Sequence, residues 1–356
     1  MNTFHCTACQ ALVFFENTKC RHCGRTLAFS PARMAMVAVS PADDGSWTPV
    51  DERAPTDEVY RLCANYLDNG VCNWAIPLTH AEPLCQACGL THTIPNQGEP
   101  ASHEAWMKLE TAKRRVVYSI LSLELPLFNK LENPKDGLEF QFLSDSVTVN
   151  GDQSRVLTGH DNGVITINVA EADDVYREAQ RQLQREPYRA LLGHFRHEVG
   201  HYYWDRLIAG SDKLDEFRRV FGDERLDYQS ALKLHYEQGA PANWDETFIS
   251  AYASTHPWED WAECWAHVMH MVDAIETAHA LGLSVKPQRR DEPALSIPAQ
   301  PSVARVEDFD SLVSEWSVLT YVLNNLTRGL GLADAYPFVL STPVIEKLRF
   351  VCGAMT

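Results

Sequence analysis

A His-Glu-x-x-His motif occupies residues 197–201 of this 356-residue chain and supplies His197, Glu198 and His201. On a helix, side chains four residues apart lie on one face, about 5–6 Å from each other. Two imidazoles held in this way can bind one Zn²⁺, and the Glu198 carboxylate between them is placed to deprotonate a metal-bound water. The motif therefore predicts a catalytic zinc site with Glu198 as general base, although five residues alone can match by chance.

A third ligand is expected downstream on another helix, because a catalytic zinc has three protein ligands and one position open for water. The candidate segment is His256–His267, in which Pro257 marks a helix start. Glu259 and Glu263 lie one turn apart in it, among three tryptophans, and such carboxylates are costly to bury unless a cation compensates their charge. Two other roles stay open: Glu259 can favour the helix dipole after a His256 N-cap, and Glu263 can form a salt bridge.

Eight of the ten cysteines fall into two sets with the spacing of metal sites, which in a reducing cytosol indicates metal binding and not disulfides. The first set has two CxxC knuckles ten residues apart, as in a zinc ribbon, with residues 12–15 as a strand of the intervening hairpin. It consists of Cys6, Cys9, Cys20 and Cys23. The second set, which predicts a second structural zinc, consists of Cys63, Cys72, Cys85 and Cys88.

The alternative for the second set is a mixture of buried and free thiols. His80 and His92 could replace a thiolate, but four thiolates already satisfy a tetrahedral ion, so both histidines are expected at the surface. Cys264 and Cys352 belong to neither set. Cys264 lies in an apolar helical pattern and is expected to be a buried, inert thiol.

Composition excludes two classes of function. The 48 acidic and 31 basic residues give a net charge of −17, which repels the phosphate backbone of nucleic acids. The first forty residues carry a net +3, but four thiolates around one metal would reduce it to +1. No run of 18 apolar residues predicts a membrane span, and no apolar leader is visible, so we expect a cytoplasmic protein.

The rest of the chain predicts a few strands followed by a mostly helical half. Ser40–Asp57 is expected to be a connector, and the Pro-rich segment Val285–Pro301 a loop. The other expected elements are a helix from Ser102 towards Pro126, a strand at Leu138–Leu143, a hairpin of residues 156–157 and 164–169, and helices at 173–186, 187–207, 308–326 and 344–352.

This order of elements is similar to that of zincin peptidases, in which a small sheet precedes the metal-binding helix and a helical lobe follows. The resemblance implies an α+β fold with a substrate cleft between the two lobes. It also implies that Val164–Val169 is the edge strand to which a peptide substrate adds. We expect a zinc ribbon at residues 1–40, a second zinc-binding segment with four cysteine ligands at 41–100 and a zincin-like metallopeptidase domain at 101–356.

The spacing around Glu259 resembles the gluzincin arrangement of anthrax lethal factor and the bacterial Pro-Pro endopeptidases. The resemblance implies that Glu259 binds the catalytic zinc and that Glu263 supports the site from the outer shell, with Glu263 as the alternative ligand. Tyr252 stands seven residues before Glu259, like the tyrosine that hydrogen-bonds the developing oxyanion in those enzymes. An ordinary helix aromatic is the other interpretation of Tyr252. The 57 residues between His201 and Glu259 are more than those enzymes have, so an inserted helical segment must be accommodated.

Over nearly its whole length the chain resembles a bacterial family of zinc-binding metallopeptidases with an N-terminal zinc-ribbon region. The motifs that carry this resemblance are the opening CxxC pair, Cys72-Asn-Trp-Ala-Ile-Pro, HEVGHYYW, HPWEDWAECWAH and the tail from Asp334 to Phe350. The resemblance implies a peptidase with one catalytic and two structural Zn²⁺, a peptide or protein substrate, and a protein partner bound through the ribbons.

Three other functions stay open at this point. An amidase or isopeptidase could use the same site on a different linkage. A non-catalytic zinc-binding scaffold would have no need for the base Glu198. A zinc-ribbon nucleic-acid binder is disfavoured by the net charge of −17.

Overall fold

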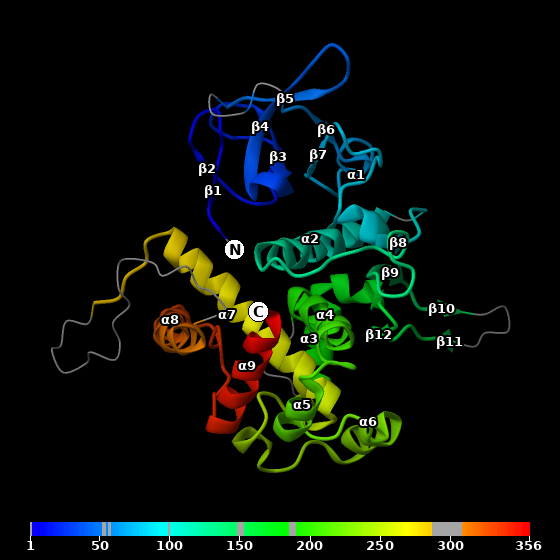
Figure 1. The fold of residues 1–356 in the computed structure, drawn as a ribbon, viewed down its shortest axis with the longest axis vertical. Coiled ribbons are helices and arrows are strands. Elements are labelled where there is room, and N and C mark those ends of the chain that lie inside the picture. The colour runs from blue at the N-terminus through cyan, green and yellow to red at the C-terminus, as the bar shows by residue number, and fades with distance from the viewer. Residues whose placement is uncertain are drawn as a thin grey trace. The chain divides into compact units, whose positions relative to one another are not determined.

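The computed structural model describes residues 2–51, 55, 58–98, 100–147, 153–184, 190–286 and 308–356. The chain divides into two compact units, Thr3–Arg177 and Glu178–Thr356. Every strand among the described residues belongs to the first unit, and the second is built from helices, coloured from green to red in Figure 1. The predicted α+β fold, with strands ahead of a helical half, is confirmed.

The first unit opens with a short antiparallel hairpin of β1 (Phe4–His5) and β2 (Leu12–Val13). Of the strand predicted at residues 12–15, only Leu12–Val13 form a strand, and its partner precedes Cys6 and does not lie between the two knuckles. A five-stranded antiparallel sheet follows, in the order β3-β4-β5-β6-β7. Its strands are β3 (Thr26–Ser30), β4 (Ala35–Pro41), β5 (Trp47–Pro49), β6 (Tyr60–Leu62) and β7 (Ala75–Pro77).

This sheet corrects the prediction that Ser40–Asp57 is a connector. Residues 40–41 end β4 and Trp47–Pro49 form β5, which pairs with β4 on one side and with β6 on the other. Proline, aspartate and glycine hide the short strands in the sequence, because they occupy the turn between β4 and β5. The sheet therefore joins the segments that carry the two cysteine sets.

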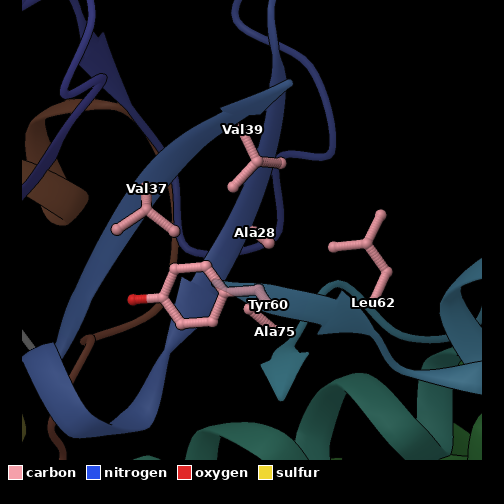
Figure 2. Close-up of a cluster of buried hydrophobic side chains, with 6 residues drawn as sticks. All are labelled: Ala28, Val37, Val39, Tyr60, Leu62 and Ala75. Carbon is pink, nitrogen blue, oxygen red and sulfur yellow. The ribbon is translucent and has the colours of Figure 1, made fainter. Parts of the chain in front are cut away.

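Buried side chains on this sheet form the hydrophobic cluster of Figure 2. Tyr60, labelled there, is 2% exposed, and its hydroxyl forms a hydrogen bond with Ser30. The partly buried Trp47 and Tyr66 pack against the cluster. The cluster consists of Ala28, Val37, Val39, Tyr60, Leu62 and Ala75. Short elements complete this part of the chain: η1 (Pro31–Arg33), α1 (Ala64–Leu67) and η2 (Cys88–Leu90).

A second sheet in the same unit has the order β12-β13-β9-β8. Its strands are β8 (Thr91–Thr93), β9 (Glu139–Leu143), β12 (Gly159–Asp161) and β13 (Val164–Asn168). The predicted strand at Leu138–Leu143 is confirmed, and its alternation buries Phe140 and Phe142. The predicted hairpin is also present, but its first strand is 159–161 and not 156–157. A further hairpin joins β10 (Ser146–Val147) and β11 (Gln153–Ser154).

The prediction that Val164–Val169 is an edge strand is wrong. β13 pairs in parallel with β9 on one side and antiparallel with β12 on the other. The tight turn at Asn162-Gly163, where both residues have positive φ, folds β12 back onto β13 and covers the edge. β12 and β8 are the two outer strands of this sheet.

Helix α2 (Pro100–Ser122) packs beside this sheet and begins two residues before the predicted Ser102. Its expected apolar positions, such as Trp106 and Leu109, are buried. The sequence pattern did not indicate that α2 also buries an ion pair. Lys113 and Glu110 lie 2.8 Å apart with fully buried side chains, and the Lys113 ammonium also lies about 6 Å from the rings of Phe140 and Phe142.

The second unit contains the helices predicted for the later part of the chain. Residues 185–189, which include the predicted helix start at Pro187, and most of the predicted loop Val285–Pro301 lie outside the described residues. No helix among the described residues is long and apolar enough to span a membrane.

The helices and 3-10 turns from residue 169 onward begin in the first unit and continue through the second. They are η3 (Val169–Ala172), α3 (Asp174–Gln184), α4 (Leu191–Leu207), α5 (Leu214–Phe221), α6 (Tyr228–Gln238), η4 (Trp244–Glu246), η5 (Tyr252–Ser254), α7 (Pro257–Ala280), α8 (Phe309–Gly329) and α9 (Thr342–Met355).

Candidate metal centres

The first cysteine set converges at two tight turns. The Gln10 amide donates to the Cys6 carbonyl at 2.8 Å, and the Gly24 amide donates to the Cys20 carbonyl at 2.9 Å. Gln10 and Gly24 both have positive φ, the backbone form that closes such a knuckle. The turns bring all four thiols together, with Sγ–Sγ distances of 3.7 Å for Cys6–Cys23 and for Cys9–Cys20.

The second cysteine set also converges, although only one of its pairs has CxxC spacing. The backbone amides of Cys85 and Cys88 donate to the sulfurs of Cys63 and Cys85, at 3.3 and 3.4 Å. Cys72 Sγ lies 3.7 Å from Cys85 Sγ, and all four residues of this set are buried. In the first set Cys23 is exposed and Cys9 is half-buried, so solvent reaches the first set more easily.

The sulfur distances match a tetrahedral zinc site. Four sulfurs around an ion at bond lengths of about 2.3 Å are about 3.8 Å apart. The measured distances of 3.7 Å agree with this value. A disulfide would hold two sulfurs only about 2.05 Å apart. Both sets therefore fit a zinc ion held by four thiolates.

The His-Glu-x-x-His motif lies on α4 and packs directly against α7. Gly200 makes this close packing possible, because a Cβ at this position would lie 3.0 Å from Ala262 Cα and 3.1 Å from Trp265 Cβ. The Trp261 indole donates a hydrogen bond to the Gly200 carbonyl at 2.8 Å and ties the two helices together. At its start, α7 has the predicted N-cap, since the His256 side chain accepts a hydrogen bond from the Trp258 amide.

This packing brings His197, His201 and Glu259 together. Nε2 of His197 lies 3.2 Å from Nε2 of His201 and 2.9 Å from Oε2 of Glu259. Nε2 of His201 lies 3.5 Å from the same oxygen. Nitrogen and oxygen ligands at about 2.0–2.1 Å from a tetrahedral zinc are about 3.3 Å apart, so the three atoms have the spacing of one face of a zinc site.

The electrostatics of the three residues are strongly coupled. Burial acts to raise the pKa of Glu259, which is 1% exposed, but His201 and His197 hold it well below its usual range. Burial acts to lower the pKa of His197, but Glu259 and Glu263 raise it well above its usual value. Glu259 and His197 therefore each stabilise the charged form of the other.

Glu198 lies in the same site and has a buried oxygen without a partner. The residue is 7% exposed, and its Oε2 atom makes no hydrogen bond among the described residues. Burial raises the pKa of Glu198, against the opposing effects of His197 and His201. A buried carboxylate oxygen without a partner is costly, and a bound water, ion or ligand would satisfy it.

Glu263 contacts the opposite side of the His197 ring. Its Oε1 lies 2.7 Å from Nδ1 of His197, whereas Glu259 lies beside Nε2. Ser250 donates to the other Glu263 oxygen at 2.6 Å. Glu263 therefore fixes the ring orientation and favours the tautomer in which Nε2 is free to bind a metal.

Two tyrosines border the site. Tyr252, predicted from its spacing, is in η5, and its ring centroid lies 5.9 Å from that of His197. Tyr228 was not predicted: its hydroxyl donates to Oε1 of Glu259 at 2.6 Å. Tyr228 is 31 residues from Glu259 in the sequence, and neither its spacing nor its neighbours indicated this contact.

The remaining candidate residues lie outside the three groups. His80 and His92 are exposed, as predicted. Cys264 is fully buried, and burial raises the pKa of its thiol well above the usual value, as expected for an inert cysteine. His267 is buried within hydrogen-bonding distance of the Tyr336 hydroxyl, at 2.9 Å.

Comparison with known proteins identifies similar sequences. Residues 102–354 match the model of a family described as "Putative zinc-binding metallo-peptidase", and residues 3–99 match a zinc-ribbon domain model. The chain is 42% identical over 352 residues to uncharacterized proteins of Mycobacterium bovis and of two strains of Mycobacterium tuberculosis. The alignment covers 99% of this chain and 94% of each relative. No solved structure gives a significant match.

Proposed function

Because this chain belongs to the family described as "Putative zinc-binding metallo-peptidase", we propose that it hydrolyses peptide bonds at a zinc site formed by His197, His201 and Glu259. The observation that carries the proposal is the grouping of these three donor atoms within 4.8 Å of one another, with the buried residue Glu198 next to His197 in the chain. Two imidazoles and one carboxylate are the donor set of one class of catalytic zinc site, which leaves a fourth position for water or substrate.

A Zn²⁺ bound there would polarise the scissile carbonyl and lower the pKa of the attacking water. Glu198 accepts the proton from that water and passes it to the leaving amine. Tyr252 donates a hydrogen bond to the oxyanion that develops on the carbonyl.

The two remaining groups of ligands have a structural role in this proposal. Each cysteine set holds one Zn²⁺ and stabilises the fold around it, for a total of two structural ions and one catalytic ion. The zinc ribbons recruit a substrate or partner protein. The protein acts in the cytoplasm, where a reducing environment keeps all ten cysteines in the thiol form that the structure has.

The Glu198 oxygen, which has no partner among the described residues, argues for this proposal over a non-catalytic scaffold. A purely structural zinc site needs no base, and a buried carboxylate beside it would only cost stability. An amidase or isopeptidase would use the same residues, so only the substrate distinguishes it from a peptidase.

The test is a peptide-library digest with the zinc-loaded protein, with and without a chelator. The proposal expects cleavage that the chelator abolishes and added zinc restores. Cleavage only of isopeptide or other non-standard linkages would favour the amidase alternative. The absence of any cleavage by fully loaded protein over a broad library would contradict a peptidase.

A further inference from the structure

Helix α6 is part of the segment between His201 and Glu259 that is longer than in the gluzincins. Tyr228 and His235 are seven residues apart on it, so their side chains lie on one face of the helix, two turns from each other. Tyr228 contacts Glu259, and the ring of His235 meets that of Tyr252 edge-on, with centroids 5.8 Å apart. This face of α6 therefore borders the metal centre.

The two oxygens of Glu259 have different surroundings. Oε2 lies beside Nε2 of His197 and Nε2 of His201, at 2.9 and 3.5 Å. Oε1 accepts the hydrogen bond of the Tyr228 hydroxyl at 2.6 Å, a short distance typical of a hydroxyl that donates to an ionised carboxylate. Because Glu259 is 1% exposed, water does not readily replace Tyr228 as the partner of Oε1.

We propose that Tyr228 is a positioning residue that holds Oε1 of Glu259, so that the carboxylate offers only Oε2 to the catalytic metal. The inference rests on the proposed function for the catalytic metal site, but the effect of Tyr228 on metal binding does not depend on turnover. A carboxylate restrained to one oxygen leaves more room for water and substrate than one that binds through both.

The experiment measures the zinc affinity of the His-Glu site by competition with a chelator, in the wild-type protein and in Tyr228→Phe. The chelator removes zinc from the cysteine sites as well as from the His-Glu site. A Glu259→Ala variant keeps all the cysteine ligands, so the zinc release that is missing in this variant belongs to the His-Glu site. Removal of an outer hydrogen-bond partner typically weakens metal binding about 10–100-fold, and we expect this loss in Tyr228→Phe. Tyr321→Phe, which removes an exposed hydroxyl on α8, is the matched control and should bind zinc like the wild type.

A second readout separates positioning from a general structural role. In protein loaded with Co²⁺, the visible absorption of the His-Glu site should change in Tyr228→Phe, because Glu259 can then bind through both oxygens. It should stay unchanged in Tyr321→Phe. Wild-type zinc affinity together with an unchanged Co²⁺ spectrum in Tyr228→Phe would overturn the proposal. If fully zinc-loaded wild type cleaved no peptide, the proposed function would fail, while these metal measurements would still decide the role of Tyr228.

Discussion

Glu259 and Glu263 lie one turn apart on α7 and meet opposite nitrogens of one imidazole. Glu259 lies 2.9 Å from Nε2 of His197, and Glu263 lies 2.7 Å from Nδ1 of the same ring. Only Nε2 also faces His201, so only Glu259 shares a possible metal position with both histidines. The local geometry thus favours the assignment that the sequence resemblance implied, with Glu259 as ligand and Glu263 as its support.

This difference predicts distinct outcomes for two alanine variants. Glu259→Ala should lower the zinc content by about one ion per chain, because three-ligand sites rarely persist with two. Glu263→Ala should retain that ion with about 10–100-fold weaker affinity, as expected for loss of an outer partner. Metal analysis after gel filtration, followed by chelator competition, measures both effects. The reverse pattern would make Glu263 the ligand.

At this scale the sequence predicted which possible metal ligands lie together in the structure, and it missed the hydroxyl groups that contact them. His197, His201 and Glu259 could be found because metal binding restricts residue type and spacing. Tyr228 and Ser250 could not, because a hydroxyl that supports a carboxylate can come from any element that the fold brings close. Their positions depend on how α6 and the chain before α7 fold.

At the scale of elements, the close contact between α4 and α7 sets the geometry of the site. Gly200 stands directly before His201, and its hydrogen atom faces Ala262, one turn after Glu259. A larger residue would separate the two helices and so move the histidines away from the carboxylate. The glycine of the motif is therefore explained by packing.

Gly200→Ala is accordingly expected to destabilise the protein. Alanine favours a helix by up to about 1 kcal/mol over glycine, whereas overpacking a close contact costs about 1–3 kcal/mol, so the clash should dominate. Urea unfolding of the second unit should show a lower midpoint, and zinc affinity at the His-Glu site should fall as well. Gly353→Ala in α9 is the control, because a Cβ there meets no atom within 4 Å and should leave stability unchanged or higher. Equal stabilisation by both substitutions would contradict this account of Gly200.

The elements with strong local signals were predicted correctly. His256 and Pro257 specify the start of α7 through an N-cap and a first-turn proline, and the alternation of residues 139–143 specifies β9. The connector at Ser40–Asp57 and the edge strand at Val164–Val169 were wrong. Whether a segment forms a strand, and whether that strand lies at the edge of a sheet, depends on the strands that pair with it. These pairings are long-range contacts that local composition does not encode.

At the scale of the whole molecule, the three candidate metal centres have independent ligands. The two cysteine sets belong to the unit Thr3–Arg177, and the His-Glu site belongs to Glu178–Thr356. Family membership supports this division, because a zinc-ribbon model matches residues 3–99 and the metallopeptidase model matches residues 102–354. The predicted domain limits at residues 40, 100 and 356 stay predictions.

Protein purified without added metal should therefore contain about three Zn²⁺ per chain. Cys20→Ser should remove one ion and destabilise the N-terminal hairpin, while the zinc at the His-Glu site stays bound. A chelator should remove zinc from the first cysteine set before the second, since Cys23 is exposed and the second set is buried. A total near one ion per chain would contradict the ribbon interpretation of both cysteine sets.

The central claim, that Glu198 is the base of a zinc peptidase, is tested most directly by Glu198→Gln. Turnover and zinc content are measured on the same preparation, with a peptide identified in the library digest. Glutamine is nearly isosteric with glutamate but cannot accept the proton, so the variant should keep wild-type zinc content and fold while kcat falls about 10²–10⁴-fold. A variant that keeps its zinc and cleaves the peptide at the wild-type rate would contradict the account.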